Sequence, residues 1–121
     1  MIRVTFSRAK NGRVCLKVMG HSGFAVKGKD IVCAAVSTLI QHTARILSKR
    51  KQCYCEKNDG FLKMVVLHSD ELSKLLLDEL LESLRDIEAQ FPENLFVEVK
   101  ENANRHTTVC SQKERWSRSQ W

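Results

Sequence analysis

The chain has 121 residues, enough for one compact domain and too few for a multidomain enzyme. Hydrophobic residues make up 43% and charged residues 28%, proportions typical of globular proteins that exclude a disordered chain. The net charge of +6 is uneven, because residues 1–60 carry 12 basic and 3 acidic side chains whereas residues 61–100 carry 4 and 9. The basic half is compatible with an anionic partner such as RNA or the ribosome surface, although charge alone favours a merely solubilising surface.

The sequence opens without a basic-then-apolar leader, and no apolar run approaches the about 20 residues that span a bilayer. We therefore expect a cytoplasmic protein without a membrane partner. Five cysteines, an odd number, favour reduced thiols over a disulfide framework. Cys53 and Cys55 share one face of an expected strand but lack a second pair of ligands, so we expect neither a metal nor another cofactor.

The first half predicts a hairpin, a loop and a helix. Apolar and polar residues alternate on both sides of Asn11-Gly12, a dipeptide that favours a tight turn. Three glycines without a regular period over 20–29 predict a flexible loop. Asp30 then precedes an apolar run that continues to a basic end, which predicts a buried helix over 30–49 with Asp30 as its N-cap.

The second half predicts another hairpin, a second helix and a last strand. Residues 52–57 and 61–68 flank the turn Asn58-Asp59-Gly60. From Asp70, leucines at steps of three or four predict an amphipathic helix that ends before Pro92, and an alternating strand follows.

The order ββαββαβ predicts a two-layer α+β domain over 1–100, with a mainly antiparallel sheet of about five strands and two long helices. The tail 101–121 loses the hydrophobic period and carries four basic side chains and two tryptophans. We expect it to be disordered or ordered by a partner.

Cys33 is the first candidate for chemistry. With Asp30 as N-cap, it occupies the third helical position, where backbone N–H groups and the helix dipole favour a thiolate. That placement suits a nucleophile, but a small buried core residue is the alternative interpretation, because free cysteine is often buried.

His21 follows the second strand, and a folded loop could bring its imidazole beside the helix start. Spacing alone does not favour it over His42 or His68. Asp30 could cap the helix, orient the histidine, or do both. Ser37, one helical turn after Cys33, could bond the reacting centre or its own helix backbone.

The glycine-rich loop could open for a substrate and close over it. A phosphate cradle is the rival interpretation, but the loop lacks the Gly-Lys-Ser/Thr ending of a P-loop.

The stretch Gly20-His21-Ser22-Gly23 followed by Gly28-Lys29-Asp30-Ile31-Val32-Cys33-Ala34-Ala35-Val36-Ser37 closely resembles the ribosomal-processing cysteine protease family, Prp. The resemblance covers residues 1 to about 100 and implies a cytoplasmic, homodimeric endopeptidase. It implies a catalytic dyad of His21 and Cys33, supporting roles for Asp30 and Ser37, and a substrate loop that includes Gly20, Ser22, Gly23 and Gly28.

The family substrate implied is the N-terminal extension of ribosomal large-subunit protein twenty-seven. Ser22 stands where alanine is more usual, and Ala25-Val26-Lys27 where glycine and proline are common in relatives. Two other functions stay open: a non-catalytic ribosome- or RNA-binding module, and a redox-sensing protein in which Cys15 resolves an oxidised thiol.

Overall fold

The computed structural model describes residues 1–21, 23, 25, 30–67 and 70–103. Its elements in chain order are β1 (Ile2–Ala9), β2 (Val14–Met19), α1 (Ile31–Lys49), β3 (Cys53–Asn58), β4 (Phe61–Val66), α2 (Glu71–Gln90) and β5 (Leu95–Ala103). This order and the α+β class are those predicted. From β1 to the start of β5, each element begins and ends within about two residues of its expected boundary. Because β5 runs to Ala103, it extends past position 100, and the rest of the expected tail lies outside the described residues.

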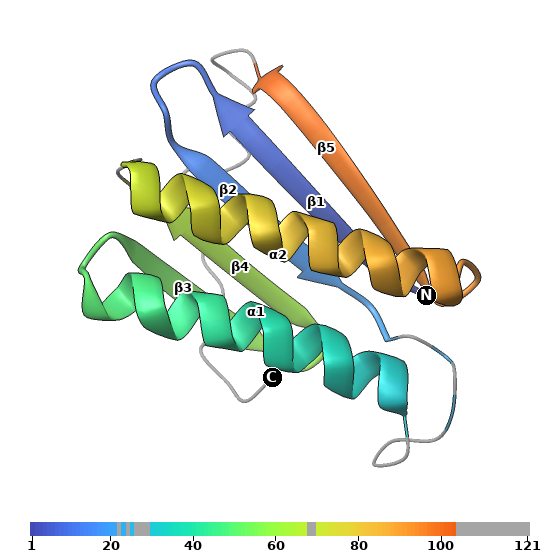
Figure 1. The fold of residues 1–121 in the computed structure, drawn as a ribbon. Coiled ribbons are helices and arrows are strands. Elements are labelled where there is room, and N and C mark those ends of the chain that lie inside the picture. Colours follow the sequence, from blue (N-terminus) through green and yellow to red (C-terminus); the bar gives the residue numbers. More distant parts are fainter. Residues whose placement is uncertain (22, 24, 26–29, 68–69, 104–121) are drawn as a thin grey trace.

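The five strands form one sheet in the order β3-β4-β2-β1-β5, and both helices cover the same face of it (Figure 1). Among the described strands only β1 and β5 pair in parallel, so the sheet is mixed but mostly antiparallel. The strand order brings the end of β2 beside the start of β4, with Met19 opposite Phe61. Consequently the β3–β4 turn lies next to the chain that follows β2.

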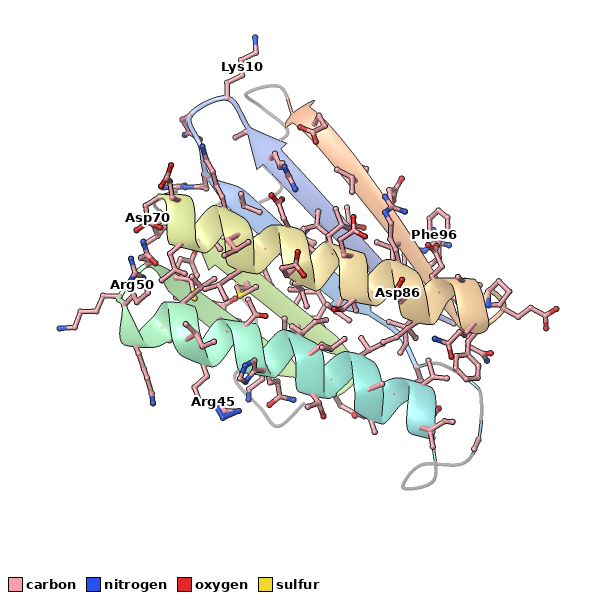
Figure 2. The ribbon with its side chains drawn as sticks, viewed as in Figure 1. Lys10, Arg45, Arg50, Asp70, Asp86 and Phe96 are labelled. Atoms are coloured by element: carbon pink, nitrogen blue, oxygen red, sulfur yellow. The ribbon has the colours of Figure 1, made fainter. Side chains whose placement is uncertain are left out.

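The main core lies between the sheet and the helices. Alternate residues of the three central strands, among them Phe6, Leu16 and Met64, are fully buried against Ile40 of α1 and Leu84 of α2. α1 is long and apolar enough to cross a membrane by length and composition, contrary to the expectation that no segment would be. It nevertheless buries one face in this core and exposes the other, where Arg45 points away from the sheet (Figure 2). We therefore interpret it as the core helix of the domain.

The opposite face of the sheet carries no described helix. Cys15 and Val65 form a second, smaller cluster there, with Tyr54 and Leu67 packed against it. Near the edge of this face the Arg3 guanidinium lies 5.2 Å from the centre of the Phe96 ring, a cation–π contact.

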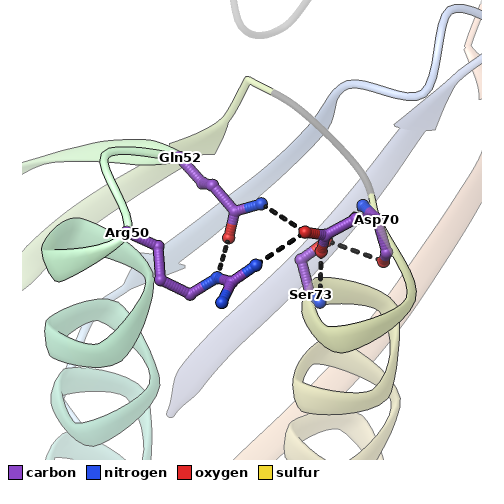
Figure 3. A network of polar contacts seen from close by, with 4 residues as sticks. All are labelled: Arg50, Gln52, Asp70 and Ser73. Carbon is purple, nitrogen blue, oxygen red and sulfur yellow. Dashed lines mark hydrogen bonds and ion pairs between the residues drawn. The ribbon is translucent and has the colours of Figure 1, made fainter.

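A polar network joins the end of α1 to the start of α2 (Figure 3). The Arg50 guanidinium donates to Asp70 Oδ2 at 2.7 Å, and the Gln52 amide donates to the same oxygen at 3.0 Å. The other oxygen of Asp70 accepts from the Ser73 backbone N–H, and Ser73 Oγ accepts from the Asp70 backbone N–H, which makes a capping box. These bonds, the Ser73 amide first, hold the pKa of Asp70 well below its usual range, although burial opposes the shift.

Candidate active site

Cys33 lies at the start of α1, in the position that the sequence predicts. Asp30 is the N-cap, and its Oδ1 accepts the backbone N–H of Cys33 at 2.9 Å. The thiol is half-buried and packs against the main core, so the cysteine is neither fully enclosed nor fully exposed. A partly accessible cysteine that forms no disulfide, in the first turn of a helix, has the surroundings expected of a nucleophile.

His21 lies at the end of β2 and is exposed. The backbone N–H of Gly20, just before it, donates to the Gly60 carbonyl oxygen at 2.8 Å. The imidazole itself lies over the turn between β3 and β4, because a Cβ on Gly60 would be 2.9 Å from His21 Nε2. The end of β2, the β3–β4 turn and the start of α1 lie at the same end of the domain (Figure 1).

The other predicted site residues lie in or near the same segment. Ser37 is half-buried on α1, one turn after Cys33. Gly23 has a φ of +73°, and a Cβ there would meet nothing within 4 Å. Ser22 and Gly28 lie outside the described residues, so the expected substrate loop is described only in part.

The remaining cysteines have different surroundings. Cys53 Sγ lies 3.5 Å from Ser48 Oγ, and burial raises the pKa of the Cys53 thiol despite this contact, which keeps it neutral. Cys53 and Cys55 share one face of β3, as predicted, and this face packs against the main core. Within the described part of the chain, no group of three or more metal-binding side chains occurs.

Cys15 is buried on the face of the sheet away from the helices, whereas Cys33 lies on α1 and packs against the main core on the other face. The sheet therefore separates the two sulfurs, and a disulfide requires Cα atoms within about 7 Å of one another. This arrangement argues against Cys15 as the resolving partner of Cys33.

Of the rival histidines, His42 is exposed on α1, nine residues beyond Cys33, and His68 lies outside the described residues. Sequence reasoning missed the β3–β4 turn as a neighbour of His21. The turn was predicted from Asn58-Asp59-Gly60, but its position depends on the order of the strands, which no local pattern specifies.

Comparisons with solved structures show which proteins this chain is similar to. SMU.848 from Streptococcus mutans is 31% identical, with a TM-score of 0.66, and the match covers 84% of this chain and 95% of that one. Two S. aureus structures of an essential ribosomal processing protease Prp, one with a covalently linked product peptide and one with a substrate peptide, are 24% identical. Their TM-scores are 0.73 and 0.70, and each match covers 83% of this chain and 100% of that one. No curated protein matches.

These similarities define the fold as the α+β fold of the Prp structures. The family model described as cysteine protease Prp matches residues 1–96. The chain therefore belongs to the Prp family of cysteine proteases, and its biochemical class is that of a thiol hydrolase acting on peptide bonds.

Proposed function

We propose that this cysteine protease is an endopeptidase that removes the N-terminal extension of ribosomal large-subunit protein twenty-seven and thereby supports ribosome assembly. The S. aureus relative is described as an essential ribosomal processing protease, and its structures hold a substrate peptide and a covalently linked product peptide. The observation that carries the proposal here is a partly accessible cysteine at a capped helix start, within a chain of the Prp family.

In the proposed mechanism Cys33 is the nucleophile and His21 the general base and acid. The Cys33 thiol gives its proton to the His21 imidazole, and the sulfur attacks the scissile carbonyl carbon. His21 then protonates the leaving amine as the C–N bond breaks, which leaves a thioester on Cys33. Water hydrolyses the thioester and returns the enzyme to its starting state.

The first turn of α1 supplies donors for the oxyanion. Asp30 already accepts the Cys33 amide through its side chain and the Ala34 amide through its carbonyl oxygen. We therefore assign the oxyanion to the backbone N–H groups of Ile31 and Val32, which precede Cys33 in the same turn. In this assignment Asp30 holds the helix start in shape, and Ser37 supports the site from the next turn.

The experiment is to incubate the full chain with a peptide that spans the extension of the host's ribosomal protein and to identify the products by mass spectrometry. A single cut that frees the extension supports the proposal. Intact peptide and intact ribosomal protein after prolonged incubation, from enzyme that alkylates at Cys33, would contradict the proposed substrate.

Three accompanying features are proposals as well: a homodimer, a cytoplasmic location, and contact with RNA or the ribosome through the basic surface. The last is motivated by the charge of the first half, part of which lies on the exposed side chains Lys10 and Arg45 (Figure 2) and on the exposed Lys49. Salt-sensitive RNA binding by the full chain would test it.

A further inference from the structure

The backbone before His21 is held between two other segments. Gly20 has a φ of +91°, and a Cβ there would lie 2.5 Å from the carbonyl oxygen of Met1, too close for any side chain. On its other side the Gly20 N–H donates to the Gly60 carbonyl oxygen at 2.8 Å. Contacts with Met1 and with the β3–β4 turn therefore fix the position of the backbone immediately before His21.

The His21 ring makes a second contact with the same turn. A Cβ on Gly60 would lie 2.9 Å from His21 Nε2, 3.3 Å from Cε1 and 3.6 Å from Cδ2. The outer edge of the imidazole thus lies on the α-carbon of Gly60. Gly60 also has a φ of +71°, in the left-handed region that favours glycine.

Two separate constraints therefore act on Gly60, the backbone conformation of the turn and the space taken by the ring. They can be separated by substitution. Asparagine tolerates the left-handed conformation better than other side chains do, yet it carries a Cβ that would displace the imidazole.

We infer that Gly60 is a positioning residue for the proposed general base: by lacking a side chain, it lets the β3–β4 turn support the His21 ring in its working orientation. This inference rests on the proposed role of His21. A displacement of about 1 Å in a reacting group is enough to slow catalysis on the order of 100-fold. Gly60 acts through His21 and not on the substrate.

The contact is tested first in the unmodified full chain. Nuclear Overhauser effects between the His21 ring protons and the Gly60 α-protons are expected, because these groups are in van der Waals contact. Their absence from a spectrum in which both residues are assigned would overturn the inference, whatever the activity. This measurement does not depend on a variant that folds.

The kinetic test compares Gly60→Asn with Gly12→Asn. Gly12 has a φ of +90° in the β1–β2 turn, at the opposite end of the sheet, and serves as the control for turn strain. We expect Gly60→Asn to lower kcat about 10- to 100-fold with little change in KM, and Gly12→Asn to keep both constants. A Gly60→Asn enzyme with the kcat of the unmodified chain would overturn the inference.

Failure of the proposed function has a different signature. If His21→Ala cleaves as fast as the unmodified chain, the role of His21 is wrong even when the ring contact is observed. If His21→Ala is inactive but Gly60→Asn is fully active, the proposed function stands and only the positioning role fails.

Discussion

The two ends of helix α1 are held in different ways. At its C-terminal end, Arg50 and Gln52 bond the carboxylate of Asp70, so side chains connect α1 to α2 (Figure 3). At its N-terminal end, Asp30 caps the helix. At the same end of the domain, His21 rests on the backbone of the β3–β4 turn. Buried residues run along the whole of α1, from Val32 to Leu47. We infer that the two ends differ in their polar contacts, and that the proposed chemistry occupies the end that follows the glycine-rich sequence.

The largest expected effect at the N-terminal end comes from Cys33→Ala. Loss of the nucleophile should lower the cleavage rate at least about 1000-fold, while the thermal transition stays nearly unchanged because the residue is only half-buried. Peptide cleavage followed by mass spectrometry and a melting curve measure both. Cys53→Ala, which removes another half-buried free thiol, is the matched control and should keep its activity. Cleavage by Cys33→Ala at the rate of this control would refute the assignment.

His21→Ala should lower kcat about 100- to 10,000-fold, because the variant lacks the group that exchanges the proton. His21 is exposed, so the fold should persist. His42→Ala, at another exposed histidine, is the control, and progress curves with the same peptide compare the two. Equal rates for both variants would exclude His21 as the base.

Substitutions in the core should lower stability and leave the catalytic rate constant unchanged, the reverse of what we expect for Cys33→Ala and His21→Ala. Leu47→Ala removes a fully buried side chain near the networked end of α1 and should lower the free energy of unfolding by about 2–5 kcal/mol. The exposed Leu75→Ala on α2 should change it by less than about 0.5 kcal/mol. Urea denaturation measures both, and kcat of the fraction that remains folded should be unchanged. A Leu47→Ala protein with normal stability would contradict the assignment of Leu47 to the core.

The network itself should have a smaller effect. Asp70→Ala removes the cap of α2 and the partner of Arg50, and should lower the melting temperature by several degrees at neutral pH. Folding lowers the pKa of Asp70, so its carboxylate stabilises the fold fully at pH values above the ordinary carboxyl pKa of about 4. This stabilisation is lost as the pH falls through the lower pKa of Asp70 in the folded state. The difference in melting temperature between variant and unmodified chain should therefore shrink below that range.

Arg50→Met should have the smallest effect, since it removes one partly exposed ion pair and the hydrogen bond from Arg50 Nε to Gln52 Oε1 but leaves the cap intact. A shift of melting temperature as large as that of Asp70→Ala would show that the ion pair, and not the cap, dominates the network.

The local parts of the fold could be predicted from the sequence. Asn11-Gly12 and Asn58-Asp59-Gly60 mark hairpins, and Asp30 and Asp70 mark helix starts, because each of these signals acts within a few residues. Cys33 was placed in the first turn of α1 for the same reason.

Long-range neighbours could not be predicted. That the β3–β4 turn supports His21 depends on β4 lying next to β2, a pairing that arises from packing of the whole sheet. Likewise, Cys15 was a plausible partner for Cys33 until the register of β2 placed it on the opposite face of the sheet.

The most direct test of the dyad is to trap the acyl-enzyme. The full chain is mixed with the extension peptide, quenched in acid within the first turnover, digested and mapped by mass spectrometry. We expect a thioester-linked product fragment on Cys33, unmodified Cys15, Cys53 and Cys55, and a much slower build-up of that fragment in His21→Ala. Cleaved peptide with no fragment on Cys33 at any quench time would contradict it.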